Sequence, residues 1–85
     1  MSYHLIFDDK ALGSLEKLPQ LIKKRIFRKL QSTKEDPFHF FIRLEGRSDY
    51  KLRVGDYRVI ADLSETEIQI LVLYVGHRKN IYKKI

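Results

Sequence analysis

The side chains best suited to chemistry surround a predicted β-hairpin. Residues 50–54 read Tyr-Lys-Leu-Arg-Val and alternate apolar with basic side chains, which is the period of a strand. Gly55-Asp56 follows as a two-residue turn, in which glycine supplies the positive φ that tight hairpins need. This turn places Arg53 opposite Arg58 on the return strand. Because side chains alternate across a strand, Lys51 points to the same face as these two arginines.

Three cations on one sheet face indicate an anion-binding site. Two like charges directly opposite each other destabilise a hairpin, so a sequence selected only for folding would place an acid or a threonine at one position. The other interpretation is a solvated outer face, where lysine and arginine are common. The convergence of Lys51, Arg53 and Arg58 favours the anion site.

A second cluster closes the sequence at residues 76–82, Gly-His-Arg-Lys-Asn-Ile-Tyr. We expect Gly76 to end the last strand and let the chain turn. Arg78 and Tyr82 are four residues apart and share a face if the tail begins a helical turn. The alternative is an ordinary basic tail whose Ile81 and Tyr82 dock on the core.

The apolar spacing before the hairpin predicts a strand and two helices. Residues 3–7 form an apolar-rich run, and Asp8 is a good N-cap for a short helix that ends before Pro19. A second helix is expected over residues 19–34, with an apolar side chain every four residues. Its stripe consists of Leu18, Ile22, Ile26 and Leu30. Asp36-Pro37 ends the helical region, because the residue before proline is pushed out of the helical basin.

The remaining elements complete an α+β fold. Ser64-Glu65 predicts a second turn, and residues 67–75 predict a last strand that is apolar on both faces, as in the centre of a sheet. We therefore expect an antiparallel sheet of about four strands. An N-terminal helical hairpin packs on one face, and a short helical tail ends the chain. Since there is no repeat and no linker-like stretch, residues 1–85 are expected to form a single domain.

Charge points to a polyanionic partner. Seventeen Lys and Arg against eleven Asp and Glu give a net charge of +6, which favours a nucleic acid or an acidic protein segment. The predicted nucleic-acid contacts are the cations of the second helix and two residues of the C-terminal cluster. They are Lys23, Lys24, Arg25, Arg28, Lys29, His77 and Lys79.

Composition narrows the class of protein further. The absence of cysteine excludes disulfides and thiolate metal sites. The first residues lack the layout of a signal peptide, and the longest apolar run, residues 70–75, is far shorter than the roughly 20 residues of a membrane span. We expect a soluble, cytoplasmic protein with no membrane partner.

Three pieces of the chain together resemble the RelE branch of the RelE/ParE toxin superfamily. They are residues 44–46, residues 50–59, and residues 75–78 with Tyr82, and their order and flanking helices are also similar. The resemblance implies a microbial RNase-like fold and the toxin of a type II toxin–antitoxin pair. It further implies a ribosome-dependent endoribonuclease that cuts messenger RNA in the decoding site and is held inactive by an acidic antitoxin.

The resemblance also assigns the catalytic residues. They are Lys51, Arg53, Arg58, Arg78 and Tyr82. The chain departs from the family pattern in two places: Arg53 stands where the best-known member has lysine, and Arg78 and Tyr82 are closer together. The second departure bears on where the tyrosine hydroxyl lies.

The chemistry expected of these residues is attack by the RNA 2′-hydroxyl, without a metal or another cofactor. His4 and His39 lie far in sequence from His77, so no histidine pair for two proton transfers is evident. The acidic residues show no metal-ligand spacing. The four cations would stabilise the phosphate, a contribution of about 3–4 kcal/mol per key donor. Tyr82 is assigned to the 2′-hydroxyl and Arg78 to the leaving oxygen.

Two other functions remain open. The ParE branch shares the scaffold and is known for inhibiting DNA gyrase. A non-catalytic basic nucleic-acid-binding module is the other, with Phe38, Phe40 and Phe41 as candidate stacking platforms. The same segment, residues 37–42, is equally suited to covering the core edge or to forming an antitoxin groove.

Overall fold

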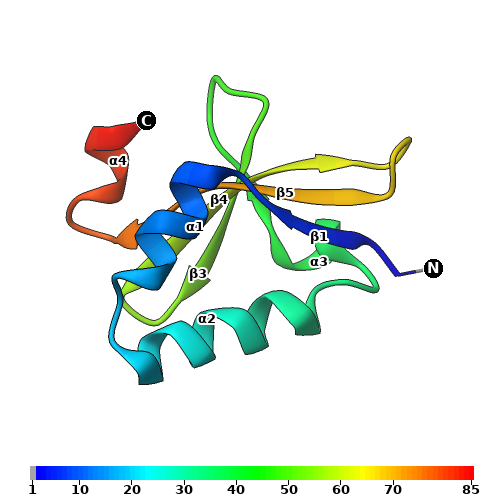
Figure 1. Cartoon of the computed structure of the whole chain (residues 1–85). Coiled ribbons are helices and arrows are strands. Elements are labelled where there is room, and N and C mark those ends of the chain that lie inside the picture. Colours follow the sequence, from blue (N-terminus) through cyan, green and yellow to red (C-terminus); the bar gives the residue numbers. More distant parts are fainter. Residues whose placement is uncertain (1) are drawn as a thin grey trace.

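The computed structural model describes residues 2–85, which form a five-stranded sheet flanked by helices (Figure 1). The elements in chain order are β1 His4–Phe7, α1 Asp9–Glu16, α2 Gln20–Ser32, α3 Pro37–Phe40, β2 Ile42–Arg43, β3 Tyr50–Val54, β4 Tyr57–Ser64, β5 Gln69–His77 and α4 Ile81–Lys84. The α+β class is confirmed. No helix within residues 2–85 is both long and apolar enough to cross a membrane.

The sheet is mixed, whereas the sequence predicted antiparallel pairing throughout. The strand order is β1-β5-β4-β3-β2, and β1 runs parallel to β5 while the other neighbours are antiparallel. A turn motif sets the direction only of the two strands that it joins. Most of the chain separates β1 from β5, so local sequence carried no signal for their relative direction.

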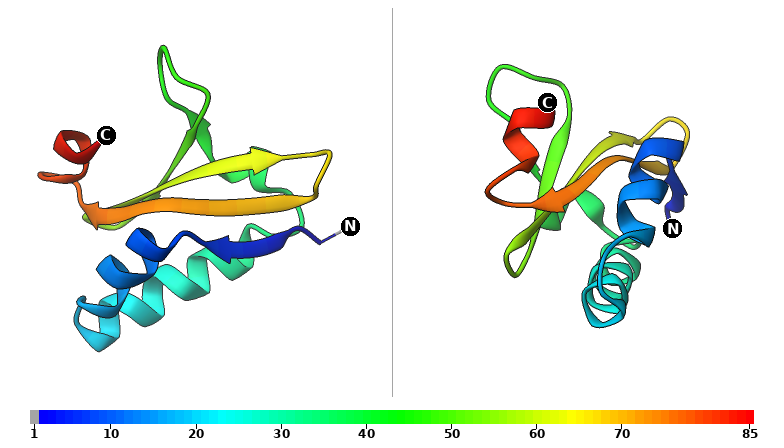
Figure 2. Two further views of the ribbon diagram at one scale, coloured as in Figure 1. Left: turned by 45° about the horizontal axis from the view of Figure 1, so that its top comes forward. Right: turned by 60° about the vertical axis from the view of Figure 1, so that its left-hand side comes forward.

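Helices α1 and α2 cover one face of the sheet (Figure 2). Asp8 caps α1, its carboxylate accepting a hydrogen bond from the Lys10 N–H at 3.2 Å, as the sequence predicted. The predicted stripe on α2 faces the sheet, and Ile26 and Leu30 are fully buried. These side chains pack with those of Leu52 and other apolar residues of β3, β4 and β5 in one hydrophobic core.

Helix α4 lies against the opposite face of the sheet through a close contact at Gly76. Gly76 pairs with Arg58, so the hydrogen that takes the place of its side chain points to the face that carries that arginine. A Cβ at this position would lie 3.2 Å from Cδ1 of Ile81, which is fully buried. The prediction that Gly76 ends the strand is therefore wrong, because β5 continues to His77. The glycine instead leaves room for α4 to dock.

The β3–β4 hairpin has the predicted turn and register. Gly55 adopts a φ of 58°, and Arg53 pairs directly with Arg58. The boundaries of the next strand differ, since β5 begins at Gln69 instead of residue 67. Ile68 has a φ of 53°, a left-handed conformation that belongs to the preceding turn and that an apolar pattern does not reveal.

Candidate functional site

A cavity of about 380 Å³ brings together four of the five predicted catalytic residues. Its β-strand cations project from the sheet face opposite α1 and α2, while Lys29 reaches it from α2 beside β3. Its lining residues are Lys29, Phe40, Ile42, Lys51, Leu52, Arg53, Arg58 and Tyr82. None of these described lining residues is acidic. Several cations that share one concave surface without a carboxylate suit a bound phosphate group.

The hairpin positions three of the four cations of this cavity, and Lys29 of α2 is the fourth. Lys51 and Arg53 project from alternate positions of β3, and Arg58 projects from β4 directly opposite Arg53. One terminal nitrogen of Arg58 donates hydrogen bonds to the carbonyl oxygens of Gly55 and Tyr57, both at 2.9 Å. These bonds fold Arg58 over the turn. The other donors of its guanidinium remain available to an anion.

Tyr82 reaches the cavity because α4 is held at two points. The first is the buried Ile81 beside Gly76. The second is Arg47 in the loop between β2 and β3, which donates a hydrogen bond of 2.7 Å to the carbonyl oxygen of Ile85. The tyrosine is about half exposed, so its hydroxyl is accessible to a substrate.

A carboxylate orients Arg47 for this contact. Asp49 is buried and accepts two hydrogen bonds from Arg47, at 2.9 and 2.8 Å. The hydrogen bonds from Arg47 lower the pKa of Asp49, and the same pairing raises the pKa of Arg47. The charged pair and the Ile85 contact together tie α4 to the β2–β3 loop.

Arg78, the fifth predicted catalytic residue, is not among the residues that line the cavity. Its backbone N–H donates to the carbonyl oxygen of Asp56 at 2.8 Å, and its side chain makes a looser contact of 3.7 Å with the Asp56 carboxylate. Arg78 therefore contacts the same hairpin turn as Arg58, from the side of the β5–α4 connection. Its side chain is more than half exposed.

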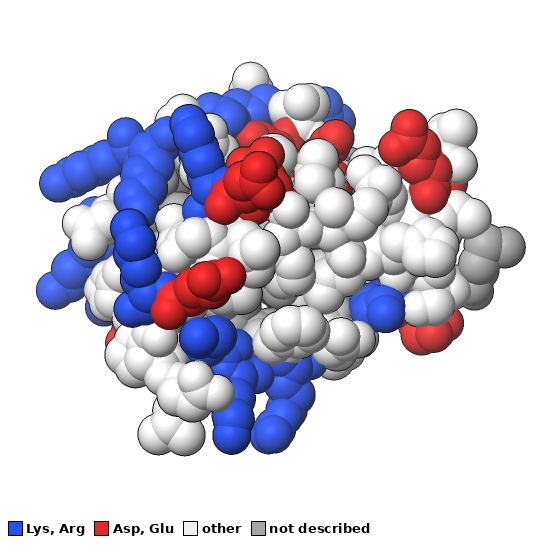
Figure 3. Space-filling view, viewed as in Figure 1, with Lys and Arg blue, Asp and Glu red and all other residues white. Residues whose placement is uncertain are grey.

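A basic groove adjoins the cavity. It has a volume of about 770 Å³ and runs between α2 and the end of β3. Four of the predicted nucleic-acid contacts line it: Lys24, Arg25, Arg28 and Lys29. Lys29 and Arg53 line both hollows, so the basic surface is continuous from α2 to the cavity. Lys23, also predicted, lies on α2 but lines neither hollow. Figure 3 shows Lys and Arg gathered over α4 and along α2 in one view.

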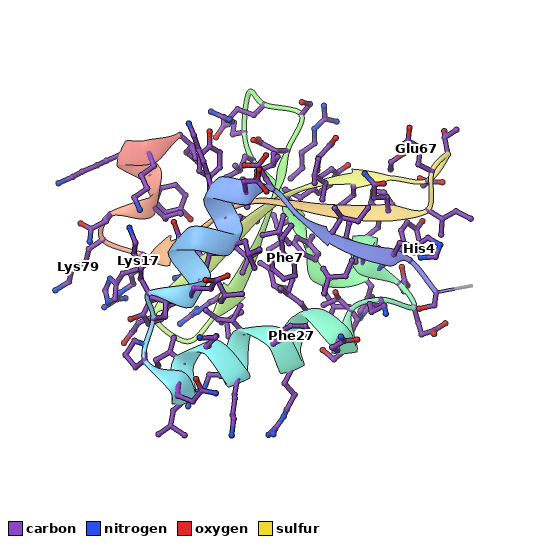
Figure 4. The ribbon with its side chains drawn as sticks, in the orientation of Figure 1. His4, Phe7, Lys17, Phe27, Glu67 and Lys79 are labelled. Carbon is purple, nitrogen blue, oxygen red and sulfur yellow. The ribbon has the colours of Figure 1, made fainter. Side chains whose placement is uncertain are left out.

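His77 and Lys79 lie away from the cavity. His77 pairs with Tyr57 and shares its face of the sheet, the face covered by α1 and α2, and the two rings meet edge to face at 5.3 Å. The Nδ1 of His77 accepts a hydrogen bond of 3.1 Å from the backbone N–H of Lys79. This contact shapes the turn into α4. The Lys79 side chain projects into solvent (Figure 4).

Two exposed apolar residues of the cavity were not predicted as part of a catalytic site. Phe40 is 39% exposed and Ile42 is 64% exposed, whereas Phe41 between them is only 4% exposed. The sequence carried no signal for this alternation, because residues 40–42 are all apolar and only their packing buries one face of the segment. Residues 2–85 contain no group of three His, Asp or Glu side chains placed to share a metal ion.

Comparison with known proteins identifies the family. A family model described as the ParE toxin of type II toxin–antitoxin system, parDE, matches residues 5–82. The mRNA interferase toxin RelE of Escherichia coli strain K12 is 30% identical over 82 residues, covering 93% of this chain and 86% of that protein. The chain is a RelE-type toxin of the RelE/ParE family. The mRNA interferase RelE of Shigella flexneri matches to the same extent.

Solved structures agree with this assignment. The toxin is similar to a chain of the intact E. coli RelBE toxin–antitoxin complex, with a TM-score of 0.76 and 28% identity over 89% of this chain and 96% of that one. A chain of the archaeal RelE–RelB complex from Pyrococcus horikoshii has a TM-score of 0.77 and 27% identity. The match covers 92% of this chain and 97% of that one. The RelBE2 complex of Mycobacterium tuberculosis supports the fold alone, with a TM-score of 0.82 at 23% identity over 92% of this chain and all of that one. The resemblance inferred from the sequence motifs is confirmed.

Proposed function

We propose that this toxin is an endoribonuclease that cuts messenger RNA in the decoding site of the ribosome. The observation that carries the proposal is the cavity in which Lys51, Arg53, Arg58 and Tyr82 meet. Two curated relatives that match most of the chain are named mRNA interferases. The activity would place the toxin in the cytoplasm, with ribosomes.

The cations and the tyrosine divide the reaction between them. Lys51, Arg53 and Arg58 hold the scissile phosphate and stabilise the extra negative charge of the pentacoordinate transition state. The Tyr82 hydroxyl orients the attacking 2′-hydroxyl or, as the phenolate, accepts its proton. Arg78 acts on the leaving 5′-oxygen. The loose contact of 3.7 Å to Asp56 leaves its guanidinium able to turn toward the cavity.

The proposed reaction uses no metal ion and no other cofactor. Cationic side chains dominate the polar lining of the cavity and repel a divalent cation, while they attract the phosphate itself. His77, the histidine nearest in sequence to the catalytic group, lies on the other face of the sheet. Catalysis then depends on the orientation of the RNA, which the ribosome supplies.

The proposed macromolecular partners follow from charge and from the relatives. The basic groove along α2 contacts ribosomal RNA. The net charge of +6 favours binding of the toxin to this polyanion. The inhibitory partner is a cognate acidic antitoxin, as the RelE relatives were solved as toxin–antitoxin complexes. We expect the bound antitoxin to cover Arg58 and Arg78.

An in vitro translation assay tests the proposal. The toxin is added to translating ribosomes, and the messenger is mapped for cuts with and without a chelator. Positioned cuts that persist in the chelator support the proposal. An intact messenger together with inhibited DNA gyrase would identify a ParE-like inhibitor. If the toxin neither cuts the messenger nor inhibits gyrase, a non-catalytic nucleic-acid-binding module would be the remaining interpretation.

The role of Tyr82 has its own variant in the same assay. Tyr82→Phe removes only the hydroxyl, so the toxin should still bind ribosomes while its single-turnover cleavage rate falls. Equal losses of binding and rate would show that the hydroxyl helps to hold the RNA and takes no part in the chemical step.

A further inference from the structure

Phe40 is an exposed aromatic ring beside the cations of the cavity, and the core does not require it. Its neighbours serve the core instead. Phe41 is 4% exposed within the hydrophobic core, and Phe38 makes edge contacts with Tyr3 and Tyr50 at 6.3 and 5.5 Å. Phe40 keeps 39% of its surface exposed and lines the cavity. An exposed aromatic ring in this position can pack its face against a flat ligand.

Several contacts hold the Phe40 ring in place. The His39 ring meets it edge to face, with centroids 5.0 Å apart and planes at 85°. The Lys29 ammonium lies 5.5 Å from its centroid. The backbone is fixed as well, since α3 begins at the buried Pro37 and the Phe41 N–H donates to the Pro37 carbonyl at 2.9 Å. A ring held this way loses little conformational entropy on binding.

Ile42 extends this apolar surface toward the cations. It is 64% exposed and pairs with Lys51 across β2 and β3, so both side chains project from the same face. The surface formed by Phe40 and Ile42 is termed the apolar shelf. The shelf and the cations Lys51, Arg53 and Arg58 line one cavity. This pairing of a flat apolar surface with positive charge matches a nucleotide, which has a flat base and an anionic phosphate.

We propose that Phe40 stacks on an unpaired base of single-stranded RNA whose neighbouring phosphate lies on Lys51 and Arg53. The inference rests on the proposed ribonuclease function and deepens it by naming a base-binding subsite. An RNA base is favoured over an apolar side chain of a protein partner because the shelf adjoins four cations and, among the described residues that line the cavity, no carboxylate. A base stacked on an aromatic ring gains about five- to a hundredfold in affinity.

Phe27 supplies a matched control. It is 43% exposed, close to the value for Phe40, but it lies on α2 with its ring 6.1 Å from that of Phe7. It lines a separate hollow beside β1 and not the catalytic cavity. Figure 4 shows Phe7 and Phe27 between β1 and α2.

The first experiment measures single-turnover cleavage on ribosomes programmed with one message, at ribosome concentrations below saturation. Phe40→Ala should reduce the rate at least about fivefold, the lower end for removal of one stacking ring. Phe40→Trp should restore it and Phe40→Leu should not, because leucine keeps the apolar volume without a π face. Phe27→Ala should cut at the wild-type rate. Wild-type cleavage by Phe40→Leu would overturn the inference in favour of a plain apolar contact.

The second experiment identifies the base. The message is prepared with an abasic sugar at each position of the decoding-site codon in turn. If Phe40 stacks on one base, the penalty of Phe40→Ala disappears for the message that lacks that base and persists for the others. A penalty that is the same for every abasic message would show that Phe40 acts through folding or through another contact, and would overturn the stacking.

A third measurement separates the subsite from the catalytic function. The chain contains no tryptophan, so Phe40→Trp and Phe27→Trp each carry a single tryptophan, which can be excited at wavelengths that the tyrosines do not absorb. A single-stranded RNA hexamer should quench the fluorescence of Phe40→Trp and leave that of Phe27→Trp unchanged. If the wild-type toxin fails to cut messenger RNA, the proposed function fails, and this titration alone decides the subsite. Equal responses of the two variants would then reject it.

Discussion

The two faces of the β3–β4 hairpin carry out different tasks with alternate residues of the same strands. One face carries Leu52 and Val59, which are buried under α1 and α2. The other carries Arg53 and Arg58, which meet as like charges directly opposite each other. The first face stabilises the fold through apolar burial. On the second face the paired arginines destabilise the hairpin locally and produce a positive potential. Changes on the two faces should therefore separate stability from activity.

The largest expected effect is on cleavage, from Arg58→Ala. The change removes a proposed phosphate ligand and also a repulsive neighbour of Arg53. The single-turnover rate on ribosomes should fall at least about a hundredfold, the usual scale for the loss of one transition-state donor. The free energy of unfolding should stay within about 0.5 kcal/mol of the wild type. Thermal unfolding and cleavage are measured on one sample of the variant. A stable variant that cuts at the wild-type rate would refute the assignment of Arg58 to the catalytic site.

Val59→Ala is the matching change on the buried face. Val59 is adjacent to Arg58 in sequence, is fully buried and points the other way. Its truncation should lower the free energy of unfolding by about 2 kcal/mol, from reduced apolar burial and the cavity left behind. The cleavage rate per folded molecule should remain at the wild-type value. A large loss of rate in the folded variant would show that the two faces are coupled.

The basic groove permits a smaller test of the cationic side. The double variant Lys24→Gln, Arg28→Gln removes two cations of the groove. The slope of log ribosome affinity against log salt concentration should become shallower by about one unit for each phosphate that is no longer neutralised. The cleavage position should not change. Lys23→Gln is the control, since Lys23 lies on α2 outside the groove. An unaltered salt slope in the double variant would assign those charges to solubility.

The smallest expected effect concerns the pair that ties α4 to the sheet. Arg47 lowers the pKa of Asp49 below its usual value of 3.8, so the pair contributes stability above that pH. The contribution is lost as pH falls through the lower pKa of the folded state. Asp49→Asn should therefore unfold at a lower temperature than the wild type at pH 7, and the gap should narrow below pH 3.8. A difference in unfolding temperature that does not change with pH would contradict the stabilising role of the Arg47–Asp49 ion pair.

The hairpin and the two long helices were predictable because short-range geometry determines them. Gly55-Asp56 sets the register of β3 against β4 through its own hydrogen bonds, and side-chain alternation then places Lys51, Arg53 and Arg58 on one face. The stripe on α2 follows from the helical repeat in the same way. For these elements the sequence was sufficient, since each signal lies within a few residues of the structure it specifies.

Tertiary packing decided the rest of the site, because contacts between distant segments leave no periodic signal in the sequence. The parallel pairing of β1 with β5, the docking of Ile81 on Gly76 and the hold of Arg47 on Ile85 all depend on how separate elements pack together. These contacts bring Tyr82 into the cavity and leave Arg78 beside the turn. They also expose Phe40 there while burying Phe41. By itself the sequence determined which cations share a sheet face. Only the packing of α3 and α4 decided which tyrosine and phenylalanine join them.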